Sequence, residues 1–370
     1  MKKRVLFVDD EAQVLDGLRD LLYRQRRRWD MVFALDGEAA LRAFEEAPFD
    51  VIVSDSRMPD MDGPALLERV KALHPATVRL ALSGYSDREA VMAALPVAHQ
   101  FLSKPCDVDV LITTVERACG LGEILPDVHL RRVVGGLDTI PSDPRVLREF
   151  VAAVARSDTD HVALAALVER DPAMALKVLQ LVNSSFFGPA KRHVLLRGAV
   201  AALGVELLRE LAGRVFAASD GGALDDLRRH SRVTARVTKR GVGDPLRAGE
   251  AFTAGLLHDI GRAILATHAP AVLEDDAQGP HGAMHATVGA YALGLWGLPR
   301  SLMDAVAFHH RPDLAGERGS DATVAVYAAN ALVDGRTLDH ELLARAGFDV
   351  ARWRAVADEE LRAADVEASS

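Results

Sequence analysis

Carboxylate, hydroxyl and ammonium side chains in the first third of the chain each follow a short apolar run of the kind that forms a buried parallel strand. They are Asp9 and Asp10, Asp55, Ser83 and Lys104. Parallel strands bring their carboxyl ends to one edge of a sheet, where open α/β sheets bind ligands. Carboxylates crowded at that edge repel one another unless a cation lies between them, and hard oxygen ligands suit Mg²⁺.

This set of groups is suited to accepting a phosphoryl group on Asp55. A magnesium ion would mask the negative charge, Lys104 would pair with a phosphate oxygen, and Ser83 would hydrogen-bond to the same group. Taken singly, each residue is more often a strand-end cap or a solvated carboxylate. Five such positions in the right strand order favour a phosphoryl-transfer site.

In the remaining two thirds of the chain, the side chains that could do chemistry are mainly histidines. His258 and Asp259 are expected on an apolar helix spanning 247–267, where a charge is unwelcome without a partner. His230, His285, and the pair His309-His310 are expected on the helices 223–241, 283–296 and 299–309. Side chains of this type bind Zn²⁺, Mn²⁺ or Fe when they converge from facing helices.

The alternative is that each histidine is a surface residue or a hydrogen-bonded core residue. Adjacent residues on a helix point about 100° apart, so His309 and His310 can face one site only where the helix bends.

The elements that must position these residues fall into two classes. Apolar strands near 4–9, 31–34, 51–54, 78–82 and 99–102 alternate with amphipathic helical segments. This order predicts an α/β doubly wound, five-stranded parallel sheet. From Leu137 onward the pattern is helical throughout and predicts an all-α domain. Its other expected helices span 144–156, 160–169, 172–183, 193–202, 204–218, 320–333 and 339–346.

The predicted boundaries are an α/β domain over 1–120, a linker over 121–136, an all-α domain over 137–346 and a tail over 347–370. The tail is expected to be helical or frayed and to carry no chemistry. The basic run 24–28 is expected to close the first helix. Basic residues on the helix 223–241 are expected to form a solvated face: Arg228, Arg229, Arg232, Arg236, Lys239 and Arg240.

Composition excludes several classes of protein. The chain has 370 residues, of which 49% are hydrophobic, and a net charge of −9. The acidic balance disfavours a non-specific binder of nucleic acid or membrane surfaces. Cys106 and Cys119 form no metal or disulfide pattern, which fits a reducing cytoplasm. No apolar run is long enough for a membrane span, and the N-terminal MKKRVLFVDD is expected to be a first strand rather than a signal peptide.

The segments VLFVDDE, VIVSDSRMPDMDG, ALSGYS and FLSKP resemble the receiver domain of two-component response regulators, over residues 1 to about 120. The resemblance implies that Asp55 is the phosphoacceptor and that a sensor histidine kinase is the phosphodonor. It further implies Mg²⁺ held by Asp9, Asp10 and Asp55 with the backbone carbonyl of Arg57, a switch pair Ser83 and Phe101, and Lys104 as the phosphate-pairing lysine.

A second group of segments resembles the HDOD domain, a relative of the HD phosphohydrolases, over about 128–340. These are PSDPRVLREFV, ALVERDPAMALKVLQLVNSSFFG, GLLHDIGRAIL, HATVGAYALGLWGLP, AFHHRP and VYAANAL. The positions that match the metal ligands of the superfamily are His230, His258, Asp259, His285, His309 and His310. Asn330 stands where the final Asp is expected, and the Gly-Tyr-Pro segment of the catalytic relatives is missing from HHRPDLAGERG. HDOD domains are regarded as non-catalytic signalling modules.

The resulting expectation is a response regulator whose phosphorylation at Asp55 switches a non-catalytic HDOD domain that acts through protein–protein interaction. Its partners would be a kinase and a signalling protein, with enzymes of cyclic di-nucleotide turnover and a second copy of the chain as options, and without direct DNA binding. The alternative is a phosphorylation-regulated metal-dependent phosphohydrolase or cyclic di-nucleotide phosphodiesterase, with Fe, Mn or Zn in the histidine site. A receiver that serves only as a phosphate sink would leave the helical domain idle.

Overall fold

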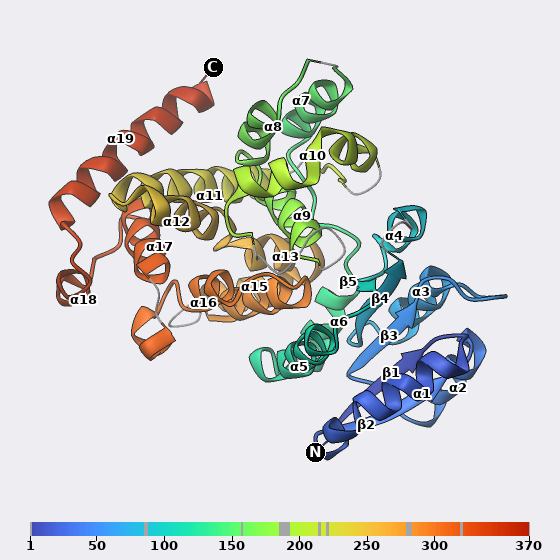
Figure 1. The fold of residues 1–370 in the computed structure, drawn as a ribbon. Helices are drawn as coiled ribbons and strands as arrows, with labels where there is room; N and C mark the ends of the chain where they lie inside the picture. Colours follow the sequence, from blue (N-terminus) through green and yellow to red (C-terminus); the bar gives the residue numbers. More distant parts are fainter. Residues whose placement is uncertain are drawn as a thin grey trace. The chain divides into compact units, whose positions relative to one another are not determined.

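Five short apolar segments of the N-terminal part pair as parallel strands in the computed structural model of the protein (Figure 1). They are β1 (Lys3–Val8), β2 (Trp29–Ala34), β3 (Val51–Asp55), β4 (Val78–Gly84) and β5 (Gln100–Lys104), in the order β2-β1-β3-β4-β5. Every residue of β3 is buried, as expected of a central parallel strand covered on both faces. The predicted doubly wound fold is therefore confirmed.

The structure describes residues 2–84, 88–156, 158–184, 193–213, 216–219, 222–278, 283–318 and 321–369. They form two compact units, the first mainly Met1–Asp138 and the second mainly the residues from Thr139 onward. Residues 185–188, the second half of the LVNSSFFG segment, lie outside the described residues.

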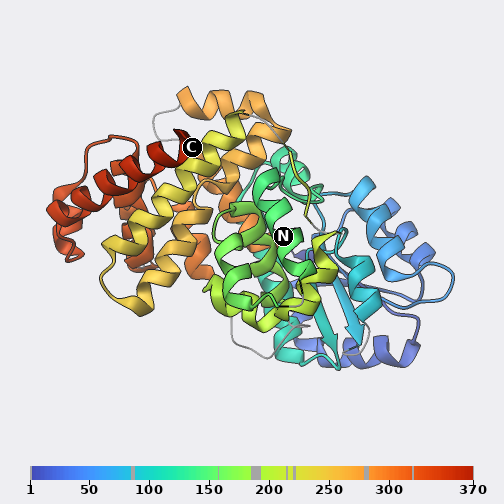
Figure 2. The ribbon, with the colours of Figure 1, turned by 90° about the horizontal axis from the view of Figure 1, so that it is seen from above.

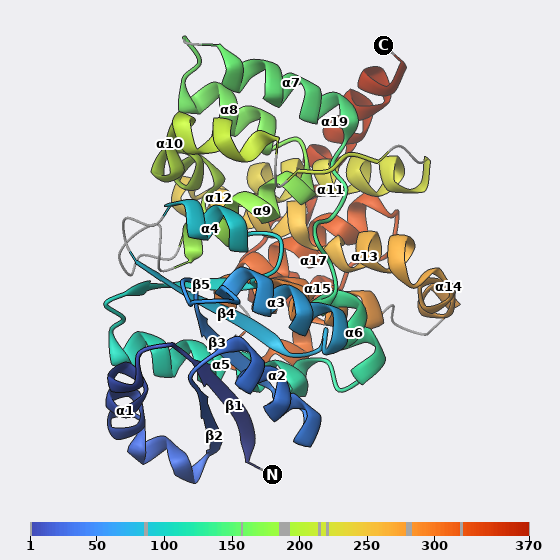
Figure 3. The same ribbon diagram turned by 90° about the vertical axis from the view of Figure 1, so that its right-hand side faces the viewer.

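Helices cover both faces of the sheet in the first unit. They are α1 (Ala12–Leu21), α2 (Gly37–Glu46), α3 (Gly63–Leu73), α4 (Arg88–Ala94), α5 (Val108–Ile124) and α6 (Val128–Gly135). Figure 3 shows α1 and α5 on one side of the sheet and α2 and α3 on the other. The basic run does not close α1 as predicted. Leu22 is fully buried where α1 ends, and Tyr23–Arg27 form a separate 3₁₀ turn that carries the arginines past it.

The segment predicted as a linker contains the last turn of α5 and the whole of α6. The carbonyl of Gly135 accepts a hydrogen bond from Nη2 of the buried Arg79 at 2.7 Å. A Cβ at Gly135 would lie only 1.9 Å from the carbonyl oxygen of Pro75. The end of α6 is therefore held against β4 by the Arg79 hydrogen bond, and only glycine permits its close approach to Pro75, which precedes β4.

The second unit is all-α, as predicted. Its helices are α7 (Pro144–Ala155), α8 (His161–Val168), α9 (Pro172–Asn183), α10 (Leu196–Ala212), α11 (Gly222–Gly241), α12 (Pro245–Leu257), α13 (Ile260–His268), α14 (Pro270–Gln278), α15 (Ala283–Leu295), α16 (Arg300–Ala307), α17 (Asp321–Val333), α18 (His340–Arg345) and α19 (Val350–Ser369), with a 3₁₀ helix η2 (Pro312–Arg318). The long helices α11 and α12 lie side by side (yellow in Figure 2). Among the described residues, no helix combines the length and apolar character that a membrane crossing requires.

The structure corrects one predicted helix and agrees with the predicted break between two others. The helix expected over 247–267 is interrupted at His258-Asp259, which separates α12 from α13. The interruption lets α13 approach α15 so closely that a Cβ at Gly261 would lie 1.9 Å from the carbonyl oxygen of His285. The break expected between the helices 193–202 and 204–218 is present at Gly204, whose non-helical φ of 75° and ψ of 158° divide α10, although α10 begins only at Leu196 and ends at Ala212.

The basic face of α11 is not simply solvated, because acidic residues of α19 lie along it. Arg236 and Arg240 form ion pairs with Glu367 and Glu360 at 2.9 and 2.8 Å. Arg228 is buried and donates to the carbonyl of Pro141 at 2.9 Å. The tail predicted to be helical or frayed is therefore helical and packs against α11.

Trp353 fixes α19 to this part of the unit. Its ring is 1% exposed, stacks on Phe348 with centroids 5.0 Å apart, and lies where a Cβ at Gly241 would meet it at 2.6 Å. We expect Trp353→Ala to lower the free energy of unfolding by about 3–5 kcal/mol, as truncation of a buried Trp does. Urea denaturation followed by circular dichroism measures this loss. Val366→Ala on the exposed side of α19 is the control and should change stability by less than about 0.5 kcal/mol.

Candidate functional site

The carboxyl ends of β1, β3 and β5 bring Asp9, Asp55 and Lys104 together in the first unit. Strand pairing places Val8 beside Ser54, so the next residues, Asp9 and Asp55, follow at the same edge. The Lys104 Nζ lies 2.7 Å from Asp9 Oδ2 and 2.6 Å from Asp55 Oδ1. One ammonium group therefore bridges two buried carboxylates at the edge where open sheets bind ligands.

The charges of these three groups depend on one another. Burial raises the pKa of Asp55, with the neighbouring charge of Asp9 acting in the same direction and Lys104 opposing both. Burial would lower the pKa of Lys104, but its hydrogen bonds with Asp55 and Asp9 outweigh this effect and raise it. Lys104 therefore stays cationic and stabilises the anionic form of Asp55, the form that acts as a nucleophile.

The other predicted residues surround this centre. Asp10 is exposed immediately after the buried Asp9, and the backbone N–H of Arg57 donates to Asp55 Oδ2 at 3.3 Å. Ser83 on β4 is buried, and its hydroxyl has no hydrogen-bond partner among the described residues. Phe101 on β5 is buried with 1% of its surface exposed.

The loop after Asp55 folds back tightly over the end of β3. The N–H of Gly63 donates to the carbonyl of Ser56 at 3.1 Å. A Cβ at Gly63 would lie 2.1 Å from the carbonyl oxygen of Asp55. The glycine at this position is therefore required for the close approach of α3 to the carboxylate-bearing edge.

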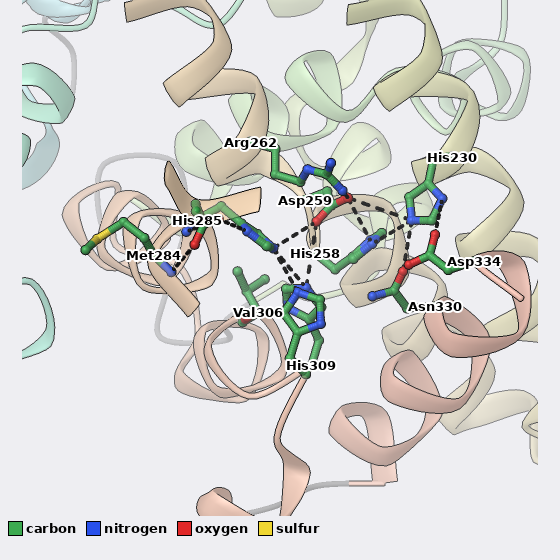
Figure 4. Close-up of polar contacts among 12 residues, drawn as sticks. His230, His258, Asp259, Arg262, Met284, His285, Val306, His309, Asn330 and Asp334 are labelled. Carbon is green, nitrogen blue, oxygen red and sulfur yellow. Dashed lines mark hydrogen bonds and ion pairs between the residues drawn. The ribbon is translucent and has the colours of Figure 1, made fainter. Parts of the chain in front are cut away.

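A second cluster forms in the second unit, where single residues from separate helices converge (Figure 4). The members are His230 on α11, His258 and Asp259 between α12 and α13, His285 on α15, His309 and His310 after α16, and Asn330 on α17. The helix predicted over 299–309 ends at Ala307. Because His309 and His310 follow the helix, the angular restriction of a helix does not apply, and both rings reach the cluster.

Asp259 lies between two groups of histidines and directs one oxygen towards each. Its Oδ2 is 3.7 Å from His230 Nε2 and 3.5 Å from His258 Nε2. Its Oδ1 is 3.4 Å from His285 Nε2 and 3.7 Å from His309 Nε2. The first triad is His230, His258 and Asp259, and the second triad is His285, His309 and His310; within each, ligand atoms lie within 4.8 Å of one another.

Hydrogen bonds orient three of the imidazole rings. Nδ1 of His258 donates to the carbonyl of Gly255 at 2.8 Å, and Nδ1 of His309 donates to that of Val306 at 2.7 Å. Nδ1 of His285 donates to Asp276 Oδ2 at 2.5 Å. In the neutral form of each ring, with the proton on Nδ1, the Nε2 lone pair is directed into the cluster, as in metal-ligating histidines.

The electrostatics of the cluster combine a buried anion with imidazoles whose pKa values shift in opposite directions. Burial would lower the pKa of His285, but its hydrogen bonds with Asp259 and Asp276 raise it. Burial lowers the pKa of His258 to about 4, and burial followed by the charges of His285 and Arg336 lowers that of His310 to about 3. Burial would raise the pKa of Asp259, but the surrounding histidines hold it well below its usual range. An ionised carboxylate with neutral imidazoles is a ligand set for Zn²⁺, Mn²⁺ or Fe.

The burial of Asp259 supports a metal centre in this cluster independently of any resemblance. Asp259 is 3% exposed, and its Oδ1 has no hydrogen-bond partner among the described residues. A buried carboxylate oxygen without a partner is costly unless a cation satisfies it. Arg262 approaches only the other oxygen, with Nη1 3.3 Å from Oδ2. The residues present therefore fit a metal centre.

Sequence reasoning missed three residues that contact the triads. Asp276 on α14, a helix that was not predicted, orients His285. Asp334 lies 3.5 Å from Nδ1 of His230, and Arg336 lies 3.3 Å from Nδ1 of His310. Asp334 could have been found one helical turn after Asn330, whereas no pattern in the sequence indicates Asp276 or Arg336.

Comparison with known proteins gives results for both units. The family model of the response regulator receiver domain matches residues 5–116, and that of the HDOD domain matches residues 140–312. The transcriptional regulatory protein ZraR of Salmonella typhimurium is 35% identical over 161 residues, which cover 42% of this chain and 35% of ZraR. An uncharacterized protein of Treponema pallidum is 29% identical over 226 residues, which cover 55% of this chain and 44% of that protein. The chain thus matches less than half the length of these relatives.

Among solved structures, the receiver domain of an HD domain-containing protein from Pseudomonas fluorescens is 30% identical with a TM-score of 0.31, covering 32% of this chain and 94% of that one. The MmoQ response regulator from Methylococcus capsulatus is 22% identical with a TM-score of 0.46, and the match covers 59% of this chain and 98% of that one. The chain therefore contains a response regulator receiver domain at 5–116 and an HDOD domain at 140–312.

Proposed function

We propose that this protein accepts a phosphoryl group on Asp55 and that phosphorylation controls the state of its HDOD domain. The observation that supports the proposal is the bridging contact of Lys104 with Asp55 and Asp9, at 2.6 and 2.7 Å. A carboxylate oxygen of Asp55 attacks phosphorus, the bond from phosphorus to the nitrogen of the donor's phosphohistidine breaks, and that nitrogen regains a proton. Lys104 then pairs with an oxygen of the acyl phosphate.

Mg²⁺, when held by Asp9, Asp10, Asp55 and the backbone carbonyl of Arg57, would neutralise the charge that gathers during transfer. Ser83 is the hydroxyl available to the new phosphoryl group, since its buried Oγ has no partner among the described residues. Phe101, on the neighbouring strand β5, is the ring that would reorient with it. The kinase partner and a cytoplasmic location are part of the same proposal.

Incubation with acetyl phosphate, with and without Mg²⁺, tests this part of the proposal. Intact-mass measurement should show the addition of one phosphoryl group only when Mg²⁺ is present. Peptide mapping after borohydride reduction should place it on Asp55. A phosphoryl group found on another residue would overturn the assignment.

Two alternative functions of the HDOD domain are supported by different observations. Interaction with a signalling protein is favoured by Asn330, a neutral amide in place of an anionic ligand, and by the missing Gly-Tyr-Pro segment. Hydrolysis of a phosphate ester is favoured by the two triads and by Asp259 between them, whose buried Oδ1 has no partner among the described residues. A metal bound there would supply a nucleophilic hydroxide and a Lewis acid.

Metal analysis of the purified protein and its His258→Ala variant, together with an assay of cyclic di-nucleotide hydrolysis, separates the two outputs. Metal in the parent that is lost in the variant, accompanied by turnover, supports the hydrolase. A metal-bearing protein without turnover, with or without phosphorylation, supports an output by interaction. A metal-free protein that does not hydrolyse the substrate overturns the metal centre altogether.

Asn330 offers a direct test of how the first triad binds metal. Its Oδ1 lies 2.9 Å from His230 Nε2, so Asn330→Asp would add an anionic oxygen beside the triad. We expect metal affinity to rise by about 10–100-fold, the usual effect of changing a group next to a metal ligand. Competition with a chelator measures the change. Gln13→Glu, which adds the same charge at an exposed position of the first unit, is the control. Equal affinity in both variants would mean that residue 330 lies outside the reach of the metal.

A further inference from the structure

Three arginines form a stripe along one face of α11, and carboxylates of α19 lie against it. The members of this arginine stripe are Arg229, Arg236 and Arg240, whose spacing of seven and four residues brings them to one side of a helix. Each of them forms an ion pair with the second half of α19, residues 358–367. The stripe is therefore a surface that already holds one acidic helix.

The second half of α19 is held mainly by charge. Arg236 pairs with Glu367 at 2.9 Å and Arg240 with Glu360 at 2.8 Å, while the two arginine side chains remain 32% and 45% exposed. Exposed ion pairs are weak, and each shifts an equilibrium by no more than about 5-fold. Within residues 358–367, Ala364 is the one residue that is buried. This half of the helix can therefore be displaced at low cost.

The first half of α19, residues 350–357, is anchored differently. Trp353, Val356 and Ala357 are all buried in the hydrophobic core of this part of the unit. Because apolar burial does not depend on the ion pairs, opening of the second half leaves the first half in place. Such local opening of a terminal segment needs much less free energy than unfolding of the whole unit.

The side chains of α19 that meet α11 indicate which partner fits the stripe. Glu360 and Glu367 lie two helical turns apart, and between them Leu361 and Ala364 pack against the hydrophobic core. An amphipathic helix with carboxylates at this spacing beside small apolar residues would make the same contacts. A nucleic-acid backbone would supply the charge but nothing in the place of Leu361, so an acidic helix is favoured.

From these contacts we infer that the arginine stripe of α11 is a docking surface for an acidic amphipathic helix of a partner protein, and that α19 is the resident helix which this partner displaces. The inference rests on the output by interaction proposed above and names its surface and the chemistry of its partner. Because α19 is tethered beside the stripe, it competes at a high effective concentration and keeps the surface closed to weaker ligands.

Exchange of the resident helix for a peptide tests the inference in the full chain. The probe is a fluorescein-labelled peptide of residues 350–369, and fluorescence anisotropy measures its affinity. We expect Glu360→Gln/Glu367→Gln to bind the peptide at least about 10-fold more tightly than the wild type, because the peptide keeps the two carboxylates that the resident helix has lost.

Two matched variants separate the stripe from a general loosening of α19. Arg236→Gln/Arg240→Gln breaks the same ion pairs but also removes the stripe, so its affinity for the peptide should stay as low as that of the wild type. Arg156→Gln/Arg311→Gln removes two exposed arginines from ion pairs elsewhere in the unit and should also behave as the wild type does.

Hydrogen exchange of the wild type gives a readout that needs no ligand. Amides of 358–367 should exchange at least about 5-fold faster when salt rises from about 0.1 M to about 1 M, whereas those of 350–357 should not change. Exchange that does not depend on salt, or equal peptide affinity in all variants, would overturn the inference. Tighter binding of a labelled DNA duplex than of the peptide by Glu360→Gln/Glu367→Gln would overturn the acidic helix as partner. Neither readout involves metal or turnover, so the metal and hydrolysis assays decide the output of the HDOD domain separately.

Discussion

Asp55→Asn is expected to abolish phosphoryl uptake while leaving the fold of the receiver domain intact. The amide has almost the same shape as the carboxylate but lacks the anionic oxygen that attacks phosphorus. Because burial raises the pKa of Asp55, a neutral group at this position costs the fold little. Lys104 keeps Asp9 as its partner at 2.7 Å, so the ammonium group does not become unpaired.

The measurement is incorporation of a phosphoryl group from acetyl phosphate with Mg²⁺, followed by intact mass, with thermal unfolding as the check on folding. Asp60→Asn provides a matched control in the same loop. It makes the same change of charge, and Asp60 has a φ of 64°, a conformation that Asn adopts readily. Loss of uptake in both variants would indicate that the charge of the loop matters, rather than a nucleophile at position 55.

The receiver site could be predicted because its residues follow directly from strand order. Each of Asp9, Asp55 and Lys104 stands at or just after the end of a short apolar run, and parallel pairing alone brings those ends together. The position of the Lys104 ammonium between the two carboxylates depends on side-chain geometry, which strand order does not specify.

The second site was only partly predictable, because its geometry depends on where helices end. A continuous helix over 247–267 agreed with the apolar pattern, yet the chain breaks at His258-Asp259 so that both side chains enter the cluster. Likewise, the conflict between His309 and His310 disappears once α16 ends at Ala307. Helix termini are the least certain feature of any sequence pattern.

The groups around the triads show a different limit of sequence reasoning. Asp276 orients His285, and Arg336 contacts His310, but neither belongs to a periodic pattern or a motif. Their contribution comes from single hydrogen bonds formed after the helices have packed. Such partners decide which ring nitrogen carries the proton, so they influence the chemistry as strongly as the ligands themselves do.

Asp259→Asn is the change with the largest expected effect on this second site. Asp259 supplies the negative charge shared by the two triads, with Oδ2 3.5 Å from His258 Nε2 and Oδ1 3.4 Å from His285 Nε2. Its replacement leaves the imidazoles facing a neutral amide, which removes most of the attraction for a divalent cation. We expect metal affinity to fall by about 100-fold or more.

Metal content after dialysis against a buffer with trace Mn²⁺ measures this loss. His310→Ala, which removes a member of the second triad only, should keep the equivalent bound by His230, His258 and Asp259. Asp275→Asn makes the same change of charge at an exposed position of α14 and should bind metal as the wild type does. Retention of wild-type affinity in Asp259→Asn would show that the metal binds elsewhere, because a site built on these triads cannot lose its shared carboxylate without losing its cation.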